Sequence, residues 1–112
     1  MWIKAIALED VPPGTACAVD HERYRIGLFH TRDGLFALDK ACPHAGADLH
    51  IGTVKGGEVL CPFHHWPFRL RDGWCRFGER FRVDTYPTQI REDWIWIELP
   101  DPVSPISGDP AT

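Results

Sequence analysis

The sequence predicts an all-β fold, a small barrel or sandwich. No window of the chain has the 3.6-residue apolar period of an amphipathic helix. Short apolar and β-branched runs alternate instead with turn-forming residues, which is typical of strands joined by tight turns. The expected strands are Ile3–Leu8, Ala16–Val19, Tyr24–His30, Leu35–Asp39, Glu58–Cys61, Phe68–Arg71, Phe81–Thr85 and Trp94–Leu99.

Turn signals separate these strands. Three tripeptides contain residues that tolerate the positive φ of tight hairpin turns: Arg32-Asp33-Gly34, Lys55-Gly56-Gly57 and Arg71-Asp72-Gly73. Pro12-Pro13-Gly14 ends the first strand, and Glu92-Asp93 can turn the chain into the last one.

One domain, spanning residues 1–99, is expected, because 112 residues suffice for a single modest core and leave no room for a second catalytic domain. Residues 41–72 fall between the early and the late strands and are expected to form a compact loop-and-hairpin insert. Residues 100–112 are rich in Pro, Ser and Gly, so we expect a tail that lies along the surface or is disordered.

Composition and charge exclude several classes of function. Hydrophobic residues make up 44% and charged residues 25% of the chain, as in an ordinary soluble globular protein. The formal charge of −4, with no run rich in Lys or Arg, argues against nucleic acid as a partner. The sequence shows neither a secretory signal nor the roughly 20 apolar residues of a membrane span, so a soluble, cytoplasmic protein without membrane partners is expected.

Two short segments carry the chemistry. Cys42-Pro43-His44 and Cys61-Pro62-Phe63-His64 each combine a thiol, an imidazole and a proline, with 16 residues between them. Two thiolates and two neutral imidazoles can together ligate a two-iron cluster, which transfers single electrons. Each proline pushes the cysteine before it toward an extended conformation and stiffens the loop. The expected metal ligands, which are also the cofactor-binding residues, are Cys42, His44, Cys61 and His64.

Other interpretations of the Cys and His residues stay open. Zinc also accepts two Cys and two His, although zinc fingers usually pair like with like, and here each loop has one of each. Cys17 and Cys75 are expected to be small buried thiols, with a disulfide between them as the alternative. His21, His30 and His50 lack a cysteine at ligand spacing and are expected at the surface or in turns. The five tryptophans are expected to be packing residues.

The stretch Cys42–Leu49, followed by Gly52 and by Cys61–Phe68, resembles the paired ligand loops of the Rieske family, and the resemblance covers most of residues 2–99. It implies a Rieske-type small β-barrel or sandwich with an inserted cluster-binding loop subdomain and one [2Fe-2S] cluster per chain. Flanking segments resemble the soluble Rieske-type ferredoxins and nitrite reductase small subunits: Val11–Gly14, Leu35–Leu38, Leu70–Gly73 and Thr85–Pro87.

The resemblance also implies a role for each ligand. Cys42 and Cys61 would hold the inner iron, and His44 and His64 the outer iron near the surface. Electrons would enter and leave through the histidine edges.

Four positions depart from the pattern of other family members. High-potential members have a disulfide between the loops, where this chain has Ala47 and Phe63, and a serine hydroxyl near the cluster, where it has Trp66. A potential at the low end of the Rieske range, about −150 to +300 mV, is therefore expected. His65 stands where the family usually has glycine, and we expect it to be exposed beside the site, with ligation by His65 in a shifted register as the alternative.

The resemblance implies an electron carrier rather than an enzyme. The leading hypothesis is a ferredoxin that takes electrons from a flavoprotein reductase to a terminal oxygenase of the ring-hydroxylating type. The close alternative is the small subunit of an NAD(P)H nitrite reductase, bound to its large subunit. An oxygenase catalytic subunit would need a second iron site in a long additional domain, for which this chain is too short. A binding or sensing module would hold a cluster that never cycles between its oxidised and reduced states.

Overall fold

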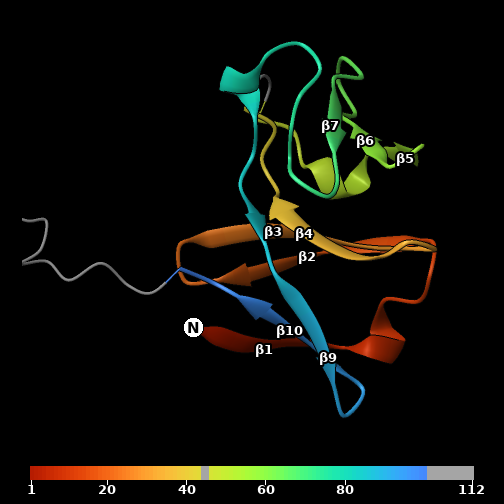
Figure 1. Cartoon of the computed structure of the whole chain (residues 1–112), viewed down its shortest axis with the longest axis vertical. Coiled ribbons are helices and arrows are strands. Elements are labelled where there is room, and N and C mark those ends of the chain that lie inside the picture. The colour runs from red at the N-terminus through yellow and green to blue at the C-terminus, as the bar shows by residue number, and fades with distance from the viewer. Residues whose placement is uncertain (44–45, 101–112) are drawn as a thin grey trace, which may run out of the picture.

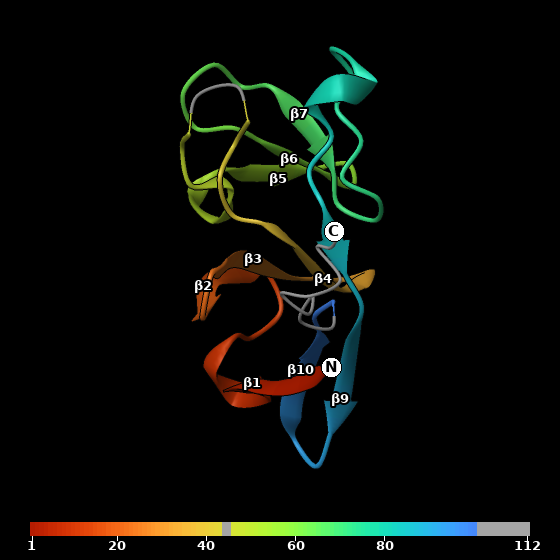
Figure 2. The ribbon, with the colours of Figure 1, turned by 90° about the vertical axis from the view of Figure 1, so that its left-hand side faces the viewer.

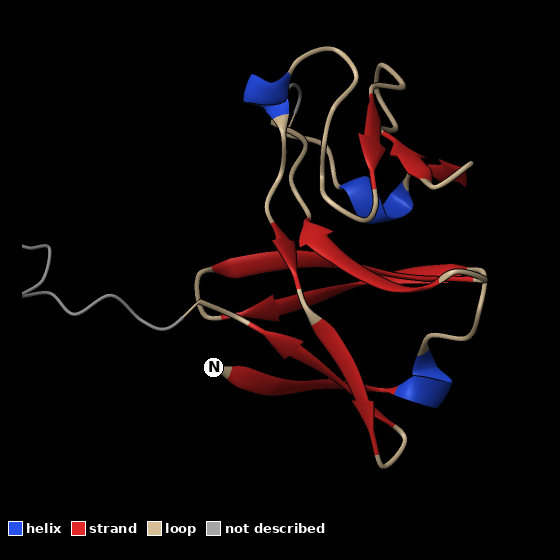
Figure 3. Cartoon of the chain, viewed as in Figure 1, coloured by secondary structure: helices blue, strands red, loops and turns tan. Residues whose placement is uncertain are grey.

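A computed structural model of the chain describes residues 1–43 and 46–100 (Figure 1). The strands are β1 (Trp2–Ala7), β2 (Thr15–His21), β3 (Tyr24–Thr31), β4 (Gly34–Asp39), β5 (Thr53–Lys55), β6 (Glu58–Leu60), β7 (Pro67–Arg69), β8 (Thr85–Tyr86), β9 (Thr88–Arg91) and β10 (Trp94–Glu98). Helical structure in the described part of the chain consists of short 3-10 turns, η1 (Leu8–Asp10), η2 (Leu49–Ile51) and η3 (Glu79–Phe81) (Figure 3). The all-β prediction is confirmed.

The strands form three antiparallel sheets, ordered β1-β10-β9, β2-β3-β4-β8 and β5-β6-β7. The first two sheets lie one above the other, and the third lies beyond β2-β3-β4, at the end of the molecule opposite β1 (Figure 2). The middle sheet therefore contacts a neighbour on each face.

The first core lies between the two sheets nearest the termini. On β10, Ile95 and Ile97 are fully buried while Trp94, Trp96 and Glu98 are partly exposed, which is the two-residue alternation of a strand with one buried face. Facing residues come from β3, β4 and β8, so this core joins segments from both ends of the chain. Its buried members are Val11, Val19, Ile26, Leu28, Ala37, Tyr86, Ile95, Ile97 and Leu99.

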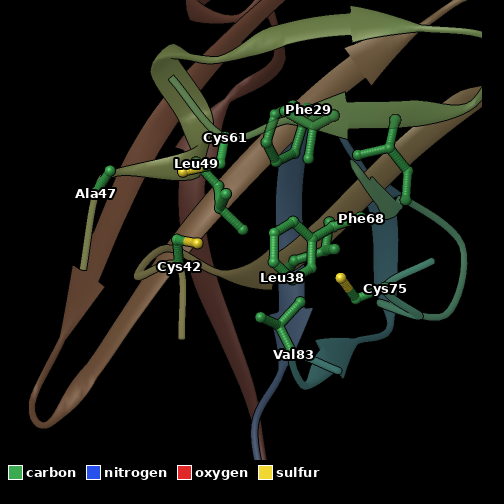
Figure 4. Packing of buried hydrophobic residues seen from close by; sticks show 11 residues of the cluster. Phe29, Leu38, Cys42, Ala47, Leu49, Cys61, Phe68, Cys75 and Val83 are labelled. Carbon is green, nitrogen blue, oxygen red and sulfur yellow. The ribbon is translucent and has the colours of Figure 1, made fainter. Parts of the chain in front are cut away.

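The second core lies on the other face of β3 and β4. Ile26 and Leu28 belong to the first core, whereas Phe29 belongs to the second, so β3 is buried on both faces. In the second core Phe29 and Leu38 of the middle sheet lie near Phe68 of β7 (Figure 4). The third sheet packs against the middle sheet in this way, and the loops that follow β4 and β6 lie against the core between them.

Several sequence predictions need correction. The expected strand Phe81–Thr85 is wrong: η3 ends at Phe81, and β8 begins only at Thr85. The rings of Phe81 and Trp66 pack edge to face, with 4.9 Å between their centroids, and Val83 is buried in the second core. These two residues are hydrophobic because they pack as part of a loop, not because they belong to a strand. Strands β5 and β9 were not expected, because nearly all their residues are exposed and show no buried face.

The predicted turns at Arg32-Asp33-Gly34, Lys55-Gly56-Gly57 and Glu92-Asp93 are confirmed, since they join β3 to β4, β5 to β6 and β9 to β10. Glu92 and Asp93 have φ of 51° and 66°, the left-handed pair that a two-residue hairpin turn requires.

The division into a 1–99 domain with an insert at about 41–72 stays a prediction. The second core extends beyond residue 72, to Cys75 and Val83. The predicted tail, apart from Pro100, lies outside the described residues, as do His44 and Ala45.

Candidate metal centre

The two cysteines of the candidate site lie at one edge of the second core. Cys42 follows β4, Cys61 follows β6, and their exposed fractions are 1% and 0%. Figure 4 shows both sulfurs at the same side of this core, with Leu49 beside them. Neither forms a disulfide. Two buried thiols are thus brought to one place by loops that are far apart in sequence.

The two loops have the same backbone hydrogen bonds. In the first, the N–H of Cys42 donates to the carbonyl of Ala47 (2.8 Å), and the N–H of Gly46 donates to the carbonyl of Cys42 (2.7 Å). In the second, the N–H of Cys61 donates to Trp66 (2.9 Å) and the N–H of His65 to Cys61 (2.9 Å). Each cysteine is therefore held at the start of an equivalent tight turn.

A close backbone approach connects the first loop to the second. A Cβ added to Gly52 would overlap the carbonyl oxygen of Leu60, the residue before Cys61, and would lie 3.2 Å from the carbonyl of Leu49. Only glycine leaves room for this approach. Gly52 therefore sets how closely the end of one cysteine loop lies against the start of the other.

The predicted histidines are only partly placed. His64 is exposed on the turn after Cys61, and His65 is exposed beside it with φ of 58°. His44 lies outside the described residues. In residues 1–43 and 46–100, no three His, Cys, Asp or Glu side chains form a group that could hold a metal ion. The ligand set therefore stays a prediction, although its donor chemistry fits: soft thiols face inward and an imidazole faces solvent.

A family model for the Rieske [2Fe-2S] domain matches residues 1–87. The chain belongs to this family. A Rieske-type [2Fe-2S] cluster is accordingly its cofactor, as the sequence predicted.

Rieske relatives with the same length and fold include two kinds of redox protein. The ferredoxin component of a naphthalene 1,2-dioxygenase system from Pseudomonas aeruginosa is 29% identical over 99 residues, which cover 88% of this chain and 95% of that protein. A ferredoxin from Sphingomonas yanoikuyae B1 superposes with a TM-score of 0.79 at 26% identity, over 89% of this Rieske chain and all of the other.

The second kind is an NADH-dependent nitrite reductase small subunit from Mycobacterium tuberculosis. Its structure matches with a TM-score of 0.78 at 28% identity, over 89% of this chain and 96% of that one. Both kinds thus share the whole described fold with this Rieske protein.

Aromatic packing beside the second loop was not predicted from the sequence. The ring centroid of Trp66 lies 5.0 Å from that of Phe77 and 4.9 Å from that of Phe81. Both phenylalanines belong to the segment after β7. Trp66 was expected to be a packing residue, but nothing in the sequence pattern indicated that Phe77 and Phe81, more than ten residues further along the chain, pack against it.

An ion pair and a glycine shape the start of that segment. Arg69 donates two hydrogen bonds to Asp72, at 2.8 and 2.5 Å, and lowers the pKa of this carboxyl to about 2. Asp72 also accepts from the N–H of Trp74 (3.1 Å). At Gly73 a Cβ would overlap the carbonyl oxygen of Val83, and φ is 75°, so glycine is required there.

The remaining Cys and His residues lie outside the two tight turns, residues 42–47 and 61–66. Cys75 is buried in the second core and Cys17 packs against the first, so no bridge joins them, and burial raises the pKa of the Cys17 thiol. The Nδ1 of His30 lies 2.7 Å from the carbonyl of Val11. His50 is half-buried, and its Nδ1 has no hydrogen-bond partner within the described part of the chain.

A cleft of about 960 Å³ lies between β2–β4 and the third sheet. His30, Arg32, His50 and Arg71 contribute to its lining, whereas Cys42, Cys61 and His64 do not. No helix in residues 1–43 and 46–100 could span a membrane.

Proposed function

We propose that this Rieske protein is a one-electron carrier whose [2Fe-2S] cluster is held by Cys42 and Cys61 on the inner iron and by His44 and His64 on the outer iron. The observation that carries this proposal is the equivalent pair of turns that begin at the two buried cysteines. When bound, the cluster would accept and release one electron at a time. The chain itself would act on no substrate.

The inner side of the proposed site is buried and its outer side is exposed. The cysteine turns lie against the second core, so their thiolates are shielded from water. His64 is exposed and would present the outer edge of the site to a redox partner. Because electron transfer between proteins needs a short path, the exposed histidine end is where we place docking.

We further propose that the partners are a flavoprotein reductase as donor and a terminal oxygenase of the ring-hydroxylating type as acceptor, in the cytoplasm. The match to a dioxygenase ferredoxin component over 95% of that protein supports this assignment. The second candidate is a nitrite reductase small subunit, supported by the match to such a subunit over 96% of its length. Both make the protein a redox component of a larger system.

The reduction potential is proposed to lie near the low end of the Rieske range. The chain has Trp66 where a hydroxyl would donate a hydrogen bond to the cluster, and the Trp66 ring packs on Phe77 and Phe81. A cluster that accepts fewer hydrogen bonds is less stabilised in its reduced state, so its reduction potential is lower.

The test combines the loaded protein with the two kinds of acceptor. The purified carrier, reduced by NADH through a flavoprotein reductase, is mixed in turn with the oxygenase component of a naphthalene dioxygenase and with the large subunit of a nitrite reductase. Turnover that depends on the carrier in the first mixture supports the leading assignment. Turnover in the second mixture alone would favour the nitrite reductase assignment, and a loaded cluster that neither accepts nor donates electrons would exclude both.

A further inference from the structure

Positive charge gathers in the part of the chain that contains the cysteine turns. Residues 41–83 hold six of the 12 Lys and Arg but only four of the 16 Asp and Glu, so they carry +2 in a chain of −4. The other described residues, 1–40 and 84–100, hold six Lys and Arg and ten Asp and Glu, so they carry −4. The β9–β10 turn, which contains Glu92 and Asp93, lies at the end of the long axis opposite the third sheet, and η1, which contains Glu9 and Asp10, lies in the same half of the molecule (Figure 1). The molecule is thus polarised along that axis.

Three arginines in this positive part, Arg71, Arg80 and Arg82, form no ion pair among the described residues. Arg69 is paired with Asp72, and Arg76 forms two 3.1 Å hydrogen bonds with Glu58. Arg80 and Arg82 are exposed, and no carboxylate among the described residues lies within ion-pair distance of either. The guanidinium of Arg80 lies 4.8 Å from the ring centre of Phe81, so its charge is held on an aromatic surface.

Exposed aromatic residues lie on and against the turn that carries His64. Phe77 is 61% exposed although its ring packs on Trp66, and Phe63, next to the proposed ligand His64, is 65% exposed. An exposed Phe costs free energy in water, and two of them beside one site indicate a surface that a partner covers. Aromatic residues and Arg are also the types that carry most binding energy at protein interfaces.

We propose that Phe77, Arg80, Phe81 and Arg82, here called the arginine–aromatic ridge, recognise an acidic protein surface with an apolar contact at its centre. The ridge rests on the proposed carrier function, because Trp66 joins it to the turn that carries His64. Charge would orient the approaching partner toward the ridge and away from the acidic end, and Phe77 would supply the short-range contact. The electron-transfer partner is then an acidic oxidoreductase rather than a basic one.

The test measures the second-order rate at which the reduced, cluster-loaded protein transfers one electron to the acidic protein cytochrome b5 and to the basic protein cytochrome c, as ionic strength is raised. Attraction between opposite charges is screened by salt, whereas repulsion between like charges is relieved by it. The sign of the salt dependence therefore reports the charge that each acceptor meets at the electron-exit surface.

Matched variants separate the ridge from net charge. Arg80→Glu/Arg82→Glu and the control Arg23→Glu/Arg32→Glu both change the formal charge from −4 to −8 at exposed positions. Phe77→Ser removes an exposed apolar ring, and Ile90→Ser is its control on β9, at the acidic end, where Ile90 is 53% exposed. The absorption spectrum and midpoint potential of each variant verify that the cluster is intact.

The wild-type rate to cytochrome b5 is expected to fall with ionic strength, although both proteins are acidic overall. Arg80→Glu/Arg82→Glu should lower that rate roughly tenfold at low salt and reverse its salt dependence, while the control changes it less than about twofold. Phe77→Ser should lower the rate at every ionic strength, and Ile90→Ser should not. If Arg80→Glu/Arg82→Glu and Arg23→Glu/Arg32→Glu had equal effects, the role of the ridge would be overturned but the carrier function would not. A loaded wild-type protein that reduces neither acceptor would instead overturn the carrier function, and the ridge with it.

Discussion

Gly46 and His65 occupy equivalent positions in the two cysteine turns. Each lies four residues after its cysteine, donates its N–H to that cysteine's carbonyl and has a left-handed φ, 71° for Gly46 and 58° for His65. Glycine adopts this conformation freely, whereas a residue with a Cβ is strained in it. The turn therefore explains why glycine suits this position and why His65 is tolerated only at a cost.

Replacing His65 with glycine should stabilise the protein. Relief of the left-handed strain should raise the free energy of unfolding by about 1 kcal/mol, and the reciprocal change Gly46→Ala should lower it by a similar amount. Chemical denaturation of both loaded variants measures the two differences. A loss of stability in His65→Gly would show that the His65 side chain makes contacts worth more than the strain.

The two adjacent histidines should differ in their effect on the cluster. His64→Ala should abolish the Rieske absorption and paramagnetic spectra, because it removes a proposed iron ligand. His65→Ala should retain both spectra, since the backbone N–H of His65, and not its ring, forms the turn. The opposite pattern would assign the ligand to His65.

Gly52 should be far less tolerant of substitution than Gly56. Gly52→Ala places a Cβ against the carbonyl oxygen of Leu60, and only a movement of the backbone can relieve this overlap. We therefore expect the free energy of unfolding to fall by about 3 kcal/mol or more, with poor cluster loading. Gly56 lies in an open turn with φ of 59°, and Gly56→Ala should cost about 1 kcal/mol with normal loading. Iron content per chain and thermal unfolding measure both outcomes. Equal loading of the two variants would contradict the role of Gly52.

Tyr86 should make stability fall at alkaline pH. Its buried hydroxyl donates to Asp39 at 2.5 Å, and burial, followed by the hydrogen bond to the Asp39 carboxylate, raises the Tyr86 pKa. Because the folded pKa lies above the unfolded value of about 10, this stabilisation is complete below pH 10 and is lost as the pH rises above it. Tyr86→Phe should cost about 1–2 kcal/mol at pH 7.

The pH profile provides the check on Tyr86. The difference in unfolding free energy between wild type and Tyr86→Phe should shrink from pH 9 to 11. A constant difference over this interval would mean that the hydroxyl does not remain protonated in the folded protein.

Much of the fold could be predicted from local sequence signals. Strands with one buried face, such as Trp94–Glu98, show alternating hydrophobicity, and Glu92-Asp93 has turn chemistry. Strands β5 and β9 lack this signal, because nearly all their residues are exposed and their ladders are formed by the backbone. Phe81 and Val83 look like strand residues, but their burial comes from loops packed in the second core.

The candidate site shows the same division. The spacing of Cys42, Cys61 and their neighbouring histidines indicated the cluster, because ligand chemistry is local in sequence. The contact of Trp66 with Phe77 and Phe81, and the approach of Gly52 to Leu60, depend on how distant segments pack, which no local pattern reports.

Electron paramagnetic resonance of the dithionite-reduced protein, recorded as a potentiometric titration, tests the carrier function most directly. We expect the signal of a cluster with mixed histidine and cysteine ligands and a midpoint near the negative end of the range, about −150 mV. A well positive midpoint would contradict the argument from Trp66. The absence of a signal from protein that instead contains zinc at Cys42 and Cys61 would contradict the electron-carrier function itself.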